Sequence, residues 1–90
     1  MNLHPAESFI GEYEQLPERL QKQTDKALAF LLRNFRHPSL QVKKMENRYD
    51  AQGREIWEAR ISQSHRFTFV IEGDDCILRR IGKHDILKTP

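Results

Sequence analysis

The chain has 90 residues, a formal net charge of +2 and an apolar fraction of 38%. This length fits one domain, expected to span residues 1–90, and leaves room for only a small core. Residues 1–39 carry five basic and five acidic side chains, so any basic surface is local to the second half of the chain. The charge therefore argues against a protein that coats DNA.

Cysteine content and hydropathy indicate the cellular compartment in which the protein is expected. Cys76 is the only cysteine, which excludes an internal disulfide and fits the reducing cytoplasm. Residues 1–10 lack the basic start and apolar run of a signal peptide, and no apolar stretch is long enough to span a membrane. The four histidines show no metal-ligand spacing. We expect a cytoplasmic protein with no metal, no cofactor and no membrane partner.

The first third of the chain predicts a helical hairpin over about residues 5–34. Pro5 can open the first helix, whose apolar residues recur at intervals of four and three. Pro17 cannot lie inside that helix but suits the start of the second, which we expect to end near Asn34. The buried stripe of the second helix is expected to contain Leu20, Ala27, Leu28, Leu31 and Leu32.

The region of about residues 40–82 predicts an antiparallel sheet, followed by a tail at residues 83–90. Its strands are expected at Leu40–Met45, Glu55–Ile61, His65–Glu72 and Cys76–Ile81. A polar loop is expected at Glu46–Arg54, and a tight turn at Gly73-Asp74. The fold class is therefore α+β, with two N-terminal helices packed on one face of a three- to four-stranded antiparallel sheet.

The central hairpin is expected to place two arginines, Arg60 and Arg66, close together on the same face of the sheet. A loop of three residues, Ser62–Ser64, places Arg60 opposite Arg66, whereas a loop of five places Arg60 opposite Thr68. Like charges at that spacing destabilise a sheet unless an anion lies between them. A phosphate group is the simplest such anion. On the next strand Arg79 shares this face, or Arg80 does if the strand contains a bulge.

Five short motifs occur in a fixed order along the chain. They are Leu16-Pro17, His37-Pro38-Ser39-Leu40, Ile56-Trp57-x-x-Arg60-Ile61, His65-Arg66-Phe67 and Gly82-Lys83-His84. Together they resemble the RelE/ParE superfamily, the toxins of bacterial type II toxin–antitoxin pairs, and most closely its YoeB and YafQ branches. The resemblance covers nearly the whole chain and implies a RelE-like fold. That fold usually begins with a short edge strand, for which Asn2–His4 is the only candidate.

The resemblance also implies an activity. RNA-cleaving members cut messenger RNA at the ribosomal A site without a metal, by attack of a 2′-hydroxyl on the adjacent phosphate. By this likeness Arg66 contacts the scissile phosphate, His84 is general acid or base, and Arg60 lies near that centre. The substrate contacts implied are Lys43, Lys44 and Arg79 or Arg80. The implied partners are a cognate antitoxin and messenger RNA in the ribosome.

The chain departs from the pattern at the catalytic carboxylate. The YoeB branch carries a glutamate where this chain reads Leu40-Gln41, and Glu46 and Glu58 lie nearby without occupying that position. Two alternatives to a nuclease therefore stay open. One is a ParE-like inhibitor of DNA gyrase with no chemistry, and the other is a catalytically decayed member that only binds an antitoxin.

Overall fold

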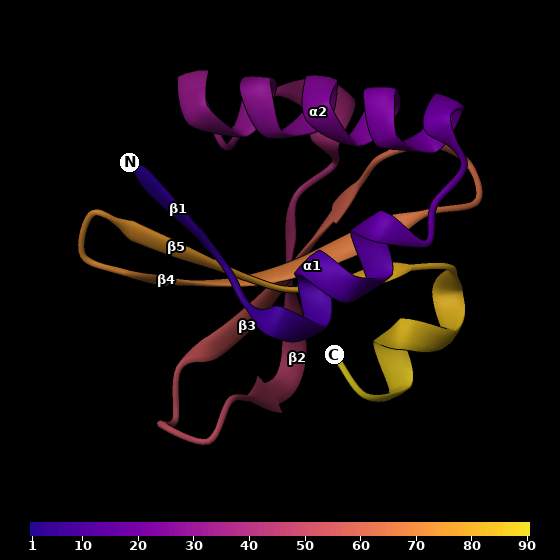
Figure 1. Cartoon of the computed structure of the whole chain (residues 1–90). Coiled ribbons are helices and arrows are strands. Elements are labelled where there is room, and N and C mark those ends of the chain that lie inside the picture. Colours follow the sequence, from indigo (N-terminus) through magenta and orange to yellow (C-terminus); the bar gives the residue numbers. More distant parts are fainter.

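The computed structural model describes residues 1–90 as a five-stranded mixed sheet with two α-helices and two short 3-10 helices (Figure 1). In chain order these are β1 Asn2–Pro5, α1 Glu7–Glu14, α2 Glu18–Arg33, η1 Pro38–Leu40, β2 Lys43–Tyr49, β3 Glu55–Arg60, β4 Arg66–Glu72, β5 Asp75–Gly82 and η2 His84–Lys88. The strand order is β1-β5-β4-β3-β2. Only the β1–β5 pair is parallel.

The two predicted helices are confirmed, with a correction at the start of the first and another in the second, where Leu32 was expected to be buried but is 49% exposed. Pro5 closes β1 instead of opening α1, because it pairs with Leu78 and the following Ala6 N–H donates to the Leu78 carbonyl at 2.8 Å. Proline is tolerated here because β1 is an edge strand, where no N–H is needed on the outer side. Pro17 immediately precedes α2, as its fixed φ predicts.

The α+β class is confirmed, but the sheet has five strands where three to four were expected. The additional strand is β1, which covers the segment named as the only edge-strand candidate. Side chains of β1 also attach the strand to β5. His4 Nε2 lies 2.9 Å from an Asp75 carboxylate oxygen, and the Asn2 side-chain amide donates to the same oxygen at 3.4 Å. The sequence pattern alone did not predict β1 for two reasons. A strand of four residues is too short to show an apolar period. Its partner β5 is parallel to it, so no hairpin turn marks the pairing.

The expected strand Leu40–Met45 and loop Glu46–Arg54 are wrong in their bounds. Leu40 belongs to η1, and β2 runs on to Tyr49. The pattern failed because β2 is an edge strand with almost every residue exposed, so its sequence shows no apolar alternation. Asn47 adopts φ 57°, and the β2–β3 register shifts between Lys44 and Tyr49.

Both hairpin turns form as one of the expected alternatives. Arg60 pairs with Arg66, so the β3–β4 loop has three residues. Glu72 pairs with Asp75, which leaves Gly73-Asp74 as a two-residue turn with Gly73 at φ 60°. The β4–β5 register then shifts, and Arg80 lies opposite Thr68. The bulge alternative is therefore the one observed, with Arg79 as the extra residue.

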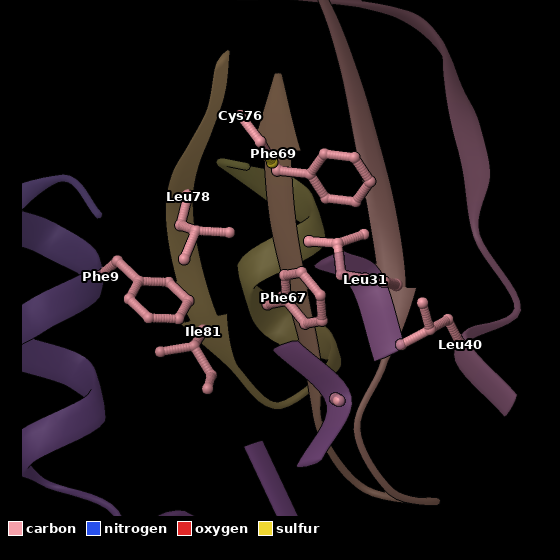
Figure 2. Close-up of a cluster of buried hydrophobic side chains, with 10 residues drawn as sticks. Phe9, Leu31, Leu40, Phe67, Phe69, Cys76, Leu78 and Ile81 are labelled. Carbon is pink, nitrogen blue, oxygen red and sulfur yellow. The ribbon is translucent and has the colours of Figure 1, made fainter. Parts of the chain in front are cut away.

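The core lies between the helices and one face of the sheet (Figure 2). Phe67 and Phe69 of β4 are fully buried at its centre, and Phe9 of α1 and Leu31 of α2 pack into the same cluster. Cys76 belongs to this cluster, and burial raises the pKa of its thiol to about 12. It therefore packs as a small hydrophobe.

The opposite face of the sheet is partly covered by the C-terminal tail. The helix η2 packs against β4 and β5, and Ile86 is buried. The Thr68 hydroxyl, itself buried, donates to the Pro90 carbonyl at 2.9 Å. The buried Ile86 thus anchors the tail, which covers part of this face.

Candidate functional site

The two arginines of the central hairpin come together as expected. Arg60 ends β3, Arg66 begins β4, and the two residues are direct partners across the strands. Such partners have Cα atoms about 4.5–5.5 Å apart. The three-residue loop and the alternation of the strands decide this register. The end of this hairpin therefore concentrates positive charge.

Arg66 is the more enclosed of the two arginines. Its side chain is 18% exposed, and its Nε lies 3.7 Å from a carboxylate oxygen of Glu58, whose side chain is 9% exposed. The Arg66 guanidinium also donates to the Ser62 carbonyl at 3.3 Å. A distance of 3.7 Å is an ionic contact and too long for a hydrogen bond. Donors of Arg66 consequently stay available for a ligand.

Glu58 supplies a carboxylate beside Arg66 that the sequence pattern does not assign. It pairs with Thr68 on β4 and with Lys43 on β2, so it sits in the middle of the sheet. The signal in the sequence was its place on the same strand face as Arg60. No motif assigns a role to Glu58, and the strand register brings it beside Arg66.

The two lysines expected to bind substrate lie in different surroundings. Lys43 is exposed and lies in one cross-strand row with Glu58, Thr68 and Arg80. Lys44 belongs to the neighbouring row, opposite Trp57, and its Nζ lies 3.4 Å from a Glu55 carboxylate oxygen. Because adjacent strand residues point to opposite faces, only Lys43 shares the face of Glu58.

The two arginines of β5 are engaged within the chain. Arg80 pairs with Glu12 of α1 at 2.5 Å and donates to the Thr89 hydroxyl at 2.8 Å. The Glu12 carboxylate raises the pKa of Arg80. Arg79 donates from Nε to the Pro90 carbonyl at 3.2 Å. Both line a cavity of about 400 Å³ beside the tail, so they join α1, β5 and the tail together.

His84 opens η2 and is exposed, with no side-chain hydrogen bond inside the chain. It follows two residues after Gly82, which is the partner of Arg66 on β5. The strand pairing therefore brings the start of η2 to the same end of the sheet as Arg66. An exposed imidazole there is free to meet a ligand.

His65 differs from His84 in being buried. Its Nδ1 lies 2.7 Å from the Ser64 hydroxyl. Burial lowers its pKa, and the positive charges of Lys83 and Arg19 lower it further. The buried ring and its hydrogen bond to Ser64 indicate a structural role for His65.

No three histidine, cysteine, aspartate or glutamate side chains come together in an arrangement that could hold a metal ion. Neither α-helix combines the length and the apolar character needed to cross a bilayer.

Comparison by sequence finds no matching family and no matching curated protein. Comparison by structure finds toxin folds. The chain is similar to the YoeB/ParE toxin from Agrobacterium tumefaciens, with 17% identity over 93% of this chain and 99% of that one, and a TM-score of 0.75. It is also similar to YafQ from Escherichia coli BL21(DE3), with 9% identity over 96% of both chains and a TM-score of 0.74.

A third similar structure is a chain of the RelB–RelE antitoxin–toxin complex from Methanococcus jannaschii. Here the identity is 15%, the cover is 96% of this chain and 95% of that one, and the TM-score is 0.72. At these identities the likeness defines the fold. The chain has the RelE-like fold that its motifs predict.

Proposed function

We propose that this chain is the toxin of a type II toxin–antitoxin system and acts as a ribosome-dependent messenger RNA endoribonuclease in the cytoplasm. The whole chain, residues 1–90, is taken as one toxin domain. The observation that carries the proposal is the pairing of Arg60 with Arg66 beside the Glu58 carboxylate, on a RelE-like fold. Similar structures include antitoxin–toxin complexes, which supports a cognate antitoxin as partner.

The proposed chemistry assigns one role to each group. Arg66, supported by Arg60, holds the scissile phosphate and the negative charge that builds on it. Glu58 accepts the proton of the attacking 2′-hydroxyl, which then bonds to phosphorus. The phosphorus–oxygen bond to the next nucleotide breaks, and protonated His84 donates its proton to the leaving 5′-oxygen. Lys43, on the same face, contacts the RNA backbone.

The test is cleavage of a translated messenger RNA, mapped by primer extension, with wild-type protein and single variants. Arg66→Ala is expected to lower the cleavage rate about 10²–10³-fold, and Glu58→Gln and His84→Ala about 10²–10⁴-fold. The matched control is Arg33→Ala, since Arg33 is exposed at the far end of α2. Full cleavage by the Arg66→Ala protein would refute the assignment.

A second candidate function is inhibition of DNA gyrase by the same fold without chemistry. The observation that favours it is the engagement of Arg79, Arg80 and Lys44 inside the chain, which removes three expected RNA contacts. Under this alternative the three variants still arrest growth, no RNA is cut, and purified protein blocks supercoiling by gyrase. A chain that arrests no growth when expressed alone would be a decayed, antitoxin-binding member.

A further inference from the structure

A second candidate binding site lies beside α2 and shares Arg60 with the proposed nuclease centre. It is a cavity of about 200 Å³ bounded by α2, η1 and the end of β3. Lys26 and Arg60 line it, and no acidic side chain does. The volume is below the range of about 300–1,000 Å³ that drug-sized ligands occupy, so the cavity suits a small group.

Positive charge in this cavity is not neutralised by the chain. Neither Lys26 nor Arg60 forms an ion pair, although Lys44, Arg54, Arg66 and Arg80 all do. Arg60 also lies directly opposite Arg66, which adds like-charge repulsion. An anion in the cavity would relieve this repulsion, and a guanidinium with an ammonium group is a common pairing for phosphate.

A polar group in the same wall lacks a partner. The Gln23 side-chain oxygen is buried and unpaired, and it is the only buried side-chain nitrogen or oxygen atom in the protein in that condition. Gln23 makes no side-chain hydrogen bond, so its amide group can rotate by about 180° and present two N–H donors in place of the oxygen. A buried polar group without a partner is destabilising, and a bound ligand would satisfy it.

One wall of the cavity is aromatic and rigid. The Phe30 ring stacks on His37 with centroids 4.1 Å apart and an angle of 7° between the rings. His37 is itself fixed, because its Nδ1 accepts a hydrogen bond from the Ser39 N–H at 3.1 Å. Phe30 and Ser39 both line the cavity. His37 covers one face of the Phe30 ring, and Lys26 Nζ lies 5.8 Å from the ring centroid, so the ring helps to hold the lysine at the cavity wall.

We propose that this cavity binds the phosphate group of a nucleotide through Lys26 and Arg60, with Gln23 bonding to the phosphate or the ribose. The site goes beyond the proposed nuclease centre, because three of its polar residues take no part in that chemistry. Only Arg60 is common to both. The cavity can therefore be tested by binding alone, without ribosomes and without cleavage.

The experiment is a titration of the ¹⁵N-labelled full chain, followed by NMR, with inorganic phosphate, adenosine 5′-monophosphate and a 2′-deoxy oligonucleotide that cannot be cut. We expect saturable shifts of the Gln23 side-chain amide and of the Ser39 backbone amide. Lys26→Gln and Arg60→Gln are each expected to weaken binding about tenfold. The control is Lys22→Gln, one turn earlier on α2, where Lys22 pairs with Glu18 outside the cavity.

The outcomes separate the sources of the phosphate. Saturation by inorganic phosphate alone, lost in both variants, supports a site for the anion itself. Tighter binding of the nucleotide or the oligonucleotide supports added contacts on the Phe30 wall. Shifts confined to other residues, or unchanged affinity in both variants, would overturn the proposal. A wild-type chain that binds phosphate in this cavity but cuts no RNA would count against the nuclease assignment only.

Discussion

Arg60 and Arg66 are partners in the sheet but have different surroundings. Arg66 is largely enclosed and lies near the Glu58 carboxylate, while Arg60 lines a cavity next to α2 and has no acidic partner. The alternation of the strands could pair the two residues, but it could not assign their neighbours. Those depend on which side chains from other elements reach the end of the hairpin.

His65 makes the stability of the fold depend on pH. Its pKa is lowered in the folded chain by burial and by Lys83 and Arg19. The unfolded chain therefore binds a proton more readily, and the free energy of unfolding falls as the pH drops below about 6.5. We expect His65→Gln to flatten this dependence in urea denaturation between pH values of about 7.5 and 5.

The matched control for that experiment is His84→Gln, because His84 is exposed and forms no side-chain hydrogen bond. This change removes an imidazole that the fold does not enclose, so it tests whether the slope depends on the buried ring of His65. Asp50 and Asp75 also have lowered pKa values, from Arg54 and the backbone at Asp50 and from His4 at Asp75. Their stabilisation is lost only as the pH falls below about 4, so the two effects separate. An unaltered slope in His65→Gln would rule out His65 as the cause.

At the scale of elements, the position of η2 depends on a close approach at Gly82. A Cβ atom added to Gly82 would lie 2.8 Å from the Ile86 Cγ2 atom. The Cγ2 methyl group is bonded directly to the Cβ atom of Ile86, which is buried. It therefore cannot move aside unless η2 moves. The sequence placed a glycine before the tail, and the contact with Ile86 gives its reason.

The substitution Gly82→Ala is therefore expected to loosen η2 and to destabilise the fold by about 1–3 kcal/mol. The free energy of unfolding from urea denaturation measures the cost, and hydrogen exchange at residues 84–88 locates it. Gly11→Ala is the control, since Gly11 lies within α1 with open space around its Cα. That change should stabilise the helix by about 0.5–1 kcal/mol. Equal effects of the two changes would contradict the packing argument.

At the scale of the whole molecule, a small core holds five strands and two helices. Only 20 of the 90 residues are buried, so each core side chain accounts for a large share of the stability. Phe67 is fully buried and lies on the central strand of the sheet, where it is part of the cluster that α1 and α2 complete. Loss of its ring should affect every layer at once.

We expect Phe67→Ala to cost about 3–5 kcal/mol, most of the stability of a domain of this size. Phe67→Leu should cost less, because it fills more of the cavity, and it keeps the prediction measurable if the alanine variant does not fold. Leu32→Ala serves as the control, since Leu32 is 49% exposed on α2 and should change stability by less than about 0.5 kcal/mol. Urea denaturation monitored by circular dichroism gives all three values.

The sequence by itself determined the elements whose signals are local. The two helices follow from apolar spacing and Pro17, and the hairpins follow from alternation and Gly73. Alternation also limited the partner of Arg60 to Arg66 or Thr68, of which the structure has Arg66. Each of these depends on residues that are near each other along the chain, so the period and the turn chemistry were sufficient.

Only the tertiary structure decided which distant groups meet. It added β1 as a parallel edge strand, extended the polar β2, and placed Glu58 beside Arg66. It also joined Arg80 to Glu12 of α1, 68 positions away in the sequence. These contacts come from strand order and from the packing of η2 and the helices on the sheet. No period or motif in a single chain encodes them, because the residues concerned become neighbours only after the layers have packed.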